Sequence, residues 1–385
     1  EKGIGDTLGS IAGIIVLGAM LGKLVAESGA AEQIASSIVQ RVGLKYIRWA
    51  LALAGFIIGI PLFYGVGFVL MIPLIFSVVY QYKLPAVSIG LPMLAALSVS
   101  FGFLPPHPSP SALVVQFNAS MGTTILFGIL IAIPTIILAG PVFSRSLMHI
   151  VSVPLQAFEP VAVPKDKTPS TVTSFLVVLL PILLFVVASL LPFAVSKQYQ
   201  PVVSFLAQPT VVLLIALAFA TYALGIRKGR TMKNVMGLYG EAVKEVALIL
   251  LIIGGAGSLK QVLIDSGVSL TITEVLRNIA LPPLFLAWLI AALIRVAVGS
   301  ATVAGFTAAG IIQPLVAQTH TNPSLMVLAI GAGSLMFSHV NDSGFWMFKE
   351  YFNISIKDTL RSWSLMETIV SVCGLAGVLL LNMIF

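Results

Sequence analysis

The sequence is poor in charge and nearly lacks cysteine. Only 9% of its 385 residues are Asp, Glu, Lys or Arg, whereas charged residues make up about a quarter of an ordinary soluble domain. This shortage excludes a soluble globular protein. The single cysteine, Cys373, excludes an internal disulfide and a metal site built from several cysteines. The net charge of +7 is spread over short loops without a basic tract, which argues against a nucleic-acid partner.

Apolar residues are what the sequence has in excess, with 58% of the chain and a mean hydropathy of +1.06. A hydrocarbon core takes roughly 20 apolar residues per helix, so this length allows about ten crossings. The stretches lack the alternation of a membrane strand, which predicts an all-α polytopic membrane protein in the lipid bilayer. We expect apolar segments at 5–26, 47–82, 84–118, 121–148, 171–195, 201–226, 243–264, 282–318, 323–353 and 364–385.

Four of these segments are interrupted. Glycines and prolines break 47–82 and 282–318, and each pattern is typical of a re-entrant hairpin of two half-helices. The other two, 84–118 and 323–353, should be discontinuous helices. No continuous helix accommodates the break in the first, since each proline there removes a backbone donor and clashes with the preceding turn. Their breaks read Gly102-Phe-Leu-Pro-Pro-His-Pro-Ser-Pro110 and Ser338-His-Val-Asn-Asp-Ser-Gly344.

The order of hairpin and then broken helix occurs twice, which indicates a duplication. An offset of 238 residues takes Gly67 to Gly305. If the basic loop 227–230 is cytoplasmic by the positive-inside rule, the helices 5–26 and 243–264 run in opposite directions. The sequence therefore predicts inverted repeats, a recurring transporter design. The expected parts are a first repeat 1–120, connecting helices 121–242, a second repeat 243–363 and a C-terminal helix 364–385.

The four breaks should converge on one site, because unpaired backbone at membrane depth is tolerated only inside protein or along a cavity. At the second hairpin tip, Gly299, Ser300, Ala301 and Thr302 combine small size, hydroxyls and a half-helix N-terminus, which suits a carboxylate. The alternative is that these small residues only allow close helix packing.

Arg295 stands thirteen residues after Pro282 in an otherwise apolar run, about 20 Å along a helix and so near mid-depth. A charge at that depth needs a partner and usually marks a pathway. Two interpretations stay open. Arg295 binds the substrate carboxylate directly as a bidentate fork, or it is the structural counter-ion of Asp342.

The break in the second discontinuous helix gathers hydroxyls, an amide and a carboxylate, from Ser338, Asn341, Asp342 and Ser343. A polyhydroxylated ligand needs that mixture. Asp342 and His339 are also candidates for proton coupling. The alternative is that these side chains cap the broken helix ends. No metal site is expected, because no further ligands lie nearby in the sequence.

The first half offers fewer polar groups. Tyr64 is the hydrogen-bonding side chain of the first hairpin tip, where Gly65 and Gly67 supply the break. His107, among the prolines, is a proton carrier, a ligand donor or a loop residue. An intramembrane hydrolase using Ser338 and His339 is not predicted, since nucleophile, base and orienting group do not occur as a set. A passive channel would not need hairpins.

The chain resembles the gluconate permease family of bacterial proton symporters over nearly its whole length. The resemblance rests on Leu17-Gly-Ala-Met-Leu-Gly-Lys23, Gly102-Phe-Leu-Pro-Pro-His-Pro108, Gly299-Ser-Ala-Thr-Val-Ala304, Phe337-Ser-His-Val-Asn-Asp342 and Lys349-Glu-Tyr-Phe-Asn353. It implies a symporter that takes up gluconate or a related sugar acid with protons across the bacterial inner membrane. It also implies no cofactor and an elevator-type homodimer. Alternatives are a permease for idonate, fructuronate or D-serine, and a sodium-coupled carboxylate symporter.

The chain departs from the resembled family in two places. Family members begin with additional membrane segments, so we expect an N-terminal portion to be missing. Gluconate permeases usually carry Tyr-Glu-Val-Gly-Phe in the first hairpin tip, where this chain reads Tyr64-Gly-Val-Gly-Phe68. An acid there would be a natural proton carrier. Its replacement by Gly65 shifts coupling to Asp342 or a histidine, alters substrate preference, or reflects a deliberate substitution.

Overall fold

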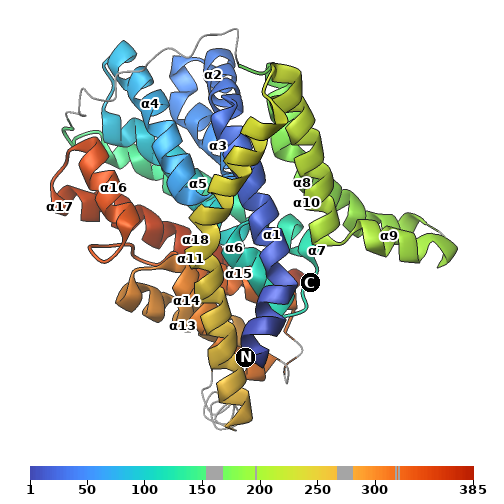
Figure 1. The fold of residues 1–385 in the computed structure, drawn as a ribbon. Helices are drawn as coiled ribbons and strands as arrows, with labels where there is room; N and C mark the ends of the chain where they lie inside the picture. The colour runs from blue at the N-terminus through green and yellow to red at the C-terminus, as the bar shows by residue number, and fades with distance from the viewer. Residues whose placement is uncertain (153–167, 196, 267–280, 317–318, 320) are drawn as a thin grey trace.

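A computed structural model describes residues 1–152, 168–195, 197–266, 281–316, 319 and 321–385. Within these ranges the regular structure is entirely helical, as the sequence predicts (Figure 1). Parts of the predicted segments 121–242, 243–363 and 282–318 lie outside the described residues. The main helices are α1 (Lys2–Glu27), α2 (Ala30–Val42), α3 (Ile47–Gly59), α4 (Tyr64–Tyr82), α5 (Ala86–Phe103), α6 (Pro108–Gln116), α7 (Met121–Ile137), α8 (Thr171–Ala194), α9 (Gln200–Leu206), α10 (Pro209–Ala220), α11 (Met232–Asp265), α13 (Pro283–Val298), α14 (Ala301–Val316), α15 (Pro323–Gly333), α16 (Ser343–Phe352), α17 (Ile356–Thr359) and α18 (Leu365–Ile384).

The apolar sequence forms both helices long enough to cross a bilayer and shorter helices. In the described part of the chain, five helical stretches are long and apolar enough to cross a bilayer: Lys2–Glu27, Ala86–Gln116, Met121–Leu147, Pro209–Lys228 and Ile356–Ile384. Other apolar helices, such as Pro283–Val298 and Pro323–Gly333, are shorter than a full crossing. In the described residues, half-length helices therefore share the apolar sequence with full spans.

Helix α2 is absent from the sequence-based prediction. Its residues AAEQIASSIVQRV include several polar side chains, so it does not stand out as an apolar run. It begins after Gly29, whose φ of +76° is a left-handed conformation that glycine adopts without strain. The Ala30 N–H donates to the Ser28 hydroxyl over 3.3 Å. The stretch Ala30–Val42 then bends by 111° into Leu44–Gly59.

Each segment predicted to be interrupted contains two helices with a break between them. The breaks lie at 60–63, 104–107, 299–300 and 334–342. Local sequence explains where the new helices begin. Pro108 occupies the first turn of α6, where its missing N–H is no loss. Asp342 caps α16 by accepting the Gly344 N–H over 3.1 Å.

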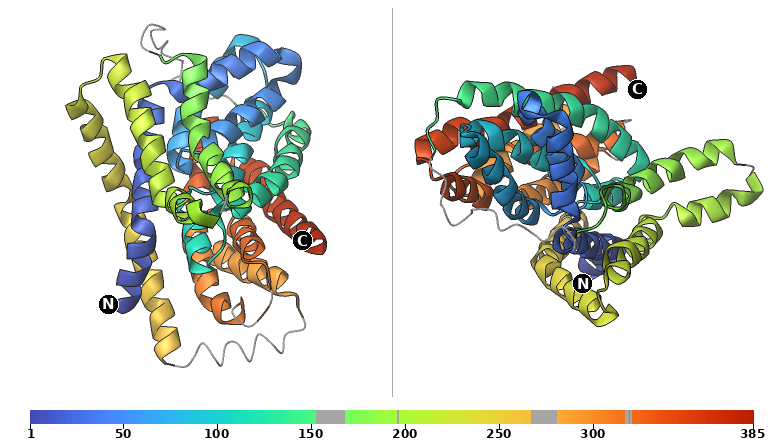
Figure 2. Two further views of the ribbon diagram at one scale, coloured as in Figure 1. Left: turned by 90° about the vertical axis from the view of Figure 1, so that its right-hand side faces the viewer. Right: turned by 90° about the horizontal axis from the view of Figure 1, so that it is seen from above.

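Two long helices run the length of the molecule. Helices α1 and α11 lie side by side, and α11 begins at Met232, eleven residues before the predicted start at 243 (Figures 1 and 2). Helices α8, α9 and α10 form an arm that projects from the rest of the protein in both figures. The predicted segment 201–226 is divided within this arm, because α9 ends at Leu206 and α10 begins at Pro209.

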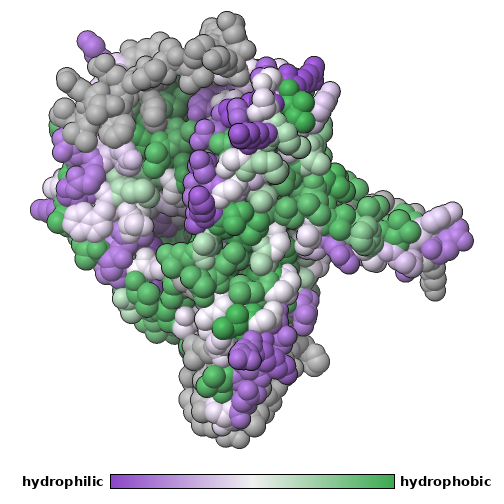
Figure 3. Space-filling view, viewed as in Figure 1, coloured by the Kyte–Doolittle hydropathy of each residue, from purple (hydrophilic) through white to green (hydrophobic). Residues whose placement is uncertain are grey.

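The outer surface suits a bilayer. Figure 3 shows a broad hydrophobic area across the middle of the molecule that continues onto the arm, with hydrophilic patches above and below it. Exposed side chains on the arm include Val202, Phe205 and Leu214. In water such an apolar area would favour aggregation, whereas in lipid it matches the solvent.

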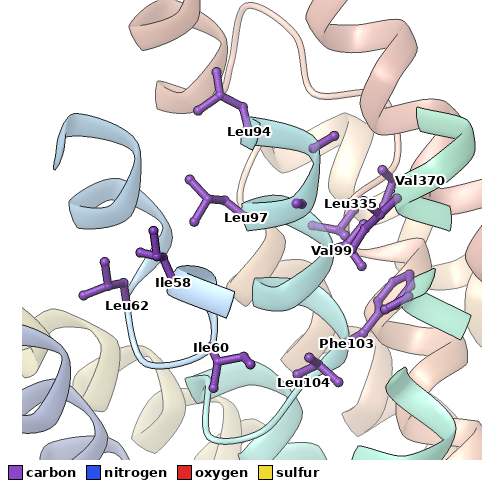
Figure 4. Packing of buried hydrophobic residues seen from close by; sticks show 14 of the residues in the cluster. Ile58, Ile60, Leu62, Leu94, Leu97, Val99, Phe103, Leu104, Leu335 and Val370 are labelled. Carbon is purple, nitrogen blue, oxygen red and sulfur yellow. The ribbon is translucent and has the colours of Figure 1, made fainter. Parts of the chain in front are cut away.

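Helix α5 lies at the centre of the core. All but one of its residues are buried, which its near-continuous apolar sequence explains. Figure 4 shows its side chains between the break at 60–63 on one side and the second half of the chain on the other. The labelled residues are Ile58, Ile60, Leu62, Leu94, Leu97, Val99, Phe103, Leu104, Leu335 and Val370. The core thus holds interrupted segments of both halves against one helix.

Candidate functional site

Two of the breaks meet directly. The Asn341 side-chain amide donates to the backbone carbonyl of Val296 over 2.9 Å, and the His339 Nε2 lies 2.9 Å from the same oxygen. Val296 belongs to the last turn of α13, whose carbonyls have no partner within the helix. The break at 334–342 therefore satisfies the end of α13, and it holds the tip between α13 and α14 in place.

Gly299 makes this close approach possible. Its φ is +82°, and its N–H donates to the Arg295 carbonyl over 2.8 Å at the end of α13. A Cβ at this position would lie 2.7 Å from the Asn341 carbonyl carbon, closer than real Cβ atoms come. Both the left-handed backbone and the lack of space require glycine here.

Arg295 and Asp342 form an ion pair across the two breaks. The Arg295 Nη2 lies 2.5 Å from the Asp342 Oδ2, and the Nη1 donates to the Gly299 carbonyl. Arg295 is only 4% exposed, and within the described ranges its Nε has no hydrogen-bond partner. The guanidinium is thus already paired, as the counter-ion interpretation predicts, while one of its donors stays unused.

A second layer of hydrogen bonds fixes Asp342. The Ser338 hydroxyl donates to the Asp342 Oδ2, and the Trp363 indole N–H donates to the Ser338 oxygen over 2.8 Å. Trp363 and Ser338 are each 1% exposed. The carboxylate orientation is therefore set by buried groups and does not depend on solvent.

These groups border a cavity of about 480 Å³, a volume typical of small-molecule sites. Its lining includes ten of the residues predicted from the sequence: Tyr64, Gly65, Arg295, Gly299, Ser300, Ala301, Thr302, Asn341, Asp342 and Ser343. Apolar and aromatic side chains complete the wall, among them Phe63, Phe101, Leu335, Met347 and Trp363. The cavity thus combines an apolar wall with a few polar groups drawn from both halves of the chain.

The N-terminus of α14 faces this cavity, because Ser300, Ala301 and Thr302 all line it. The Ser300 hydroxyl accepts the Val303 N–H over 3.3 Å and caps the helix. The first N–H groups of a helix lack intrahelical partners, and the helix dipole adds positive potential at this end. This part of the wall is suited to an anion.

Tyr64 brings an unpaired hydroxyl from the first half of the chain. Its ring centroid lies 6.0 Å from that of Phe101 and 6.0 Å from that of Trp363. These contacts hold the ring, yet the buried hydroxyl has no hydrogen-bond partner in the part of the chain that the structure describes. An unpaired buried hydroxyl beside a cavity is free to bind a polar ligand.

Four predicted site residues do not line the cavity. Ser338 lies behind Asp342, as described above. His339 is half-buried and contacts Val296, and a Cβ on Gly67 would meet Leu97. His107 is buried, with its Nε2 2.7 Å from the Gly59 carbonyl at the end of α3. Of the three alternatives for His107, its place just before α6, with the ring turned to the end of α3, fits a loop residue.

Glu367 was missed by the sequence analysis. It lines the same cavity, is 2% exposed, and accepts hydrogen bonds from the Ser98 hydroxyl at 2.7 and 2.9 Å. The sequence placed it near the start of a helix at 364–385, where an acid is unremarkable. The helical stretch begins at Ile356 instead, so Glu367 lies deep inside it. A single acid in this apolar run was the available signal.

Comparison with known proteins identifies the family. The model of the GntP family permeases matches residues 1–384. The chain is 48% identical to a high-affinity gluconate transporter of Escherichia coli K12, covering 100% of this chain and 88% of the relative. It is 44% identical to the Gnt-II system L-idonate transporter of the same organism, over 99% of this chain and 88% of that one.

The fold is similar to that of a solved transporter. The crystal structure of the YdaH transporter of Alcanivorax borkumensis superimposes with a TM-score of 0.69, covering 98% of this chain and 86% of the other at 19% identity. At this identity the likeness concerns the fold alone. With the apolar helices and the full-length family match, it follows that the chain is a multi-pass membrane permease and belongs to the GntP permease family.

Proposed function

We propose that this permease takes up gluconate or a closely related sugar acid across the bacterial inner membrane by proton symport, using the cavity between the breaks. The observation that carries the proposal is the composition of the cavity wall. The wall offers a cation and a helix N-terminus together with hydroxyl and amide groups. A sugar acid has the matching parts, a carboxylate at one end and a chain of hydroxyls.

The carboxylate is assigned to the side formed by Arg295 and the start of α14. The Arg295 Nε is buried without a partner, and Ser300 and Thr302 bring hydroxyl donors next to the free N–H groups of the helix. Asp342 neutralises much of the guanidinium charge before substrate arrives. The helix end and the unused donor therefore matter as much as the charge of Arg295 itself.

The hydroxyl chain is assigned to Tyr64, Asn341 and Ser343. The Tyr64 hydroxyl is unpaired, and Asn341 uses its amide N–H groups on α13, which leaves its carbonyl oxygen as an acceptor. Hydrogen bonds to buried groups discriminate strongly, since an analogue without the hydroxyl leaves them unpaired. Sugar acids differ in the configuration of their hydroxyl groups, so these hydrogen bonds distinguish one sugar acid from another.

Transport requires that the cavity open to each side in turn. The four breaks support an arrangement of inverted repeats, 1–120 and 243–363, with hairpins 47–82 and 282–318 as re-entrant elements. In this proposal the hairpins and discontinuous helices move as one body in an elevator motion, within a homodimer. The cavity lies where those elements meet, as alternating access requires.

A second candidate substrate is idonate, because a relative at 44% identity is named an L-idonate transporter. The two candidates are separated by competition. Purified protein in proteoliposomes is tested for uptake of labelled gluconate against unlabelled gluconate, idonate, fructuronate and D-serine. Gluconate or idonate should compete most strongly. If no sugar acid in the panel competes and no gluconate enters, the proposed function is wrong.

Coupling is tested in the same vesicles. An imposed pH gradient, acidic outside, should drive gluconate accumulation without sodium. Because an equilibrium ratio changes tenfold per 1.4 kcal/mol, one pH unit sustains about tenfold accumulation when one proton accompanies each anion. Accumulation that follows a sodium gradient and ignores the pH gradient would replace proton symport with sodium coupling.

A further inference from the structure

Glu367 is a carboxyl group inside the cavity with no assigned role. It projects from α18 and is 2% exposed. The Ser98 hydroxyl of α5 contacts both of its oxygens, at 2.7 and 2.9 Å. One hydroxyl supplies a single proton to this pair of oxygens, whereas an ionised carboxylate has about four acceptor sites. Its hydrogen-bonding capacity is thus far from filled.

Glu367 also lacks an ion-pair partner among the residues that the structure describes. Among the ion pairs in the described part of the chain, none includes Glu367, and Arg295 is engaged by Asp342. An isolated carboxylate is costly to bury, and it becomes tolerable when paired or when it binds a proton. Here the pair is absent, so a proton is the available way to remove the charge.

The surrounding elements leave few other groups that titrate. Helices α5, α7 and α15, which pack against α18, contain no Asp, Glu, His, Lys, Arg, Cys or Tyr. Arg361 in the turn before α18 is exposed. The groups that share the cavity with Glu367 are Arg295 from α13, Tyr64 from α4 and Asp342 at the start of α16.

The charged side chains that line the cavity link the binding of a proton to the binding of a substrate anion. Arg295 offsets Asp342, so an ionised Glu367 would leave the cavity with a net negative charge that opposes a substrate carboxylate. A proton on Glu367 removes this opposition. By linkage, an anion bound nearby must then strengthen proton binding to the same extent.

We propose that Glu367, held by Ser98, is the proton-binding site of the symport. A proton from water on the outer side binds a carboxylate oxygen of Glu367, and the sugar acid binds as an anion in the same cavity. Both leave together on the inner side, where the proton passes back to water. No covalent bond of the substrate changes. This inference rests on the proposed function.

The test compares two kinds of transport in proteoliposomes containing Glu367→Gln, which keeps the shape of the side chain and removes the titrating group. Exchange of labelled for unlabelled gluconate at equal pH needs binding and movement but no net proton flow. This exchange should persist in the variant. Accumulation under a pH gradient should fall from about tenfold per pH unit to simple equilibration.

Glu350→Gln is the matched control. Glu350 lies on α16 outside the cavity, and its exposed carboxylate pairs with Lys349 over 2.8 Å. This variant should accumulate gluconate as the wild type does. Glu367→Gln vesicles that still accumulate gluconate with the pH gradient overturn the assignment of Glu367. Wild-type vesicles without gluconate exchange contradict the proposed function instead, so the two failures are distinguishable.

A second measurement uses the wild type, in case Glu367→Gln does not fold. Dicyclohexylcarbodiimide is apolar and reacts with protonated carboxyl groups: the carboxyl proton moves to a nitrogen of the reagent, and the carboxyl oxygen adds to its central carbon. Peptide mapping by mass spectrometry should find the label on Glu367, and less of it at high pH, where the carboxyl group loses its proton. Labelling confined to other carboxyl groups at every pH would contradict the proposal.

Discussion

Gly299 and Asn341 are packed so closely that a methyl group on Gly299 would lie 2.7 Å from the Asn341 carbonyl carbon. This contact joins the tip between α13 and α14 to the break before α16. It explains why the cation, the helix N-terminus and the carboxylate of Asp342 border one cavity. The geometry of the site therefore depends on a residue without a side chain.

Substituting Gly299 should damage both stability and transport. In Gly299→Ala the left-handed backbone costs roughly 1–2 kcal/mol, and forcing the tip away from Asn341 adds about 1–3 kcal/mol. Thermal unfolding in detergent and gluconate uptake measure the two effects. Gly310→Ala, in the same helix pair with open space around its Cβ position, is the control and should behave as wild type. Equal behaviour of both variants would show that the tip tolerates a side chain.

The Arg295–Asp342 ion pair should contribute more than an exposed one. Removing one partner of a buried pair typically costs about 3–5 kcal/mol, so Arg295→Ala should lower the free energy of unfolding by an amount of that order and abolish gluconate binding. Lys349→Ala, which breaks an exposed pair, should cost at most about 1 kcal/mol. Calorimetric titration with gluconate follows the binding. A folded Arg295→Ala protein with unchanged gluconate affinity would remove Arg295 from the site.

Tyr64→Phe separates binding from folding. The Tyr64 hydroxyl has no hydrogen-bond partner among the described residues, so its removal should leave thermal stability unchanged or slightly higher. Gluconate affinity should fall by about 0.5–1.5 kcal/mol, up to roughly tenfold, through the lost hydrogen bond. Tyr222→Phe, at a tyrosine that is 59% exposed, is the control. If Tyr64→Phe destabilises the protein and leaves gluconate affinity intact, the hydroxyl has a structural role.

The sequence predicted the breaks well where local chemistry interrupts a helix. Three breaks are located by residues that act on the backbone at their own positions. These residues are Gly299, the prolines within 105–110 and the polar residues of 338–344. Arg295 stood out as one charge in an apolar run, and the structure gives it the predicted neighbour, Asp342. Such signals depend on a few adjacent residues.

What the sequence could not give is the pairing of distant residues. Ser98 and Glu367 are 269 positions apart, and no local pattern connects them. Glu367 was further obscured because the polar residues of 357–361 suggested a loop, whereas the helical stretch passes through them from Ile356. His107 is the opposite case. The prolines around it predicted a place in the site, but in the fold its ring faces the Gly59 carbonyl.

The location of the substrate can be tested directly with thiol chemistry, since Cys373 is the one cysteine of the chain. In a Cys373→Ser background, Thr302→Cys places a thiol in the proposed carboxylate site. Thr7→Cys places one in a separate cavity beside α1 and serves as the control. Modification rates with a water-soluble methanethiosulfonate reagent are measured with and without saturating gluconate, after exchange assays confirm that each variant binds gluconate. Gluconate should slow the reaction at position 302 and leave position 7 unaffected, whereas equal rates at position 302 with and without gluconate would contradict a sugar-acid site at the start of α14.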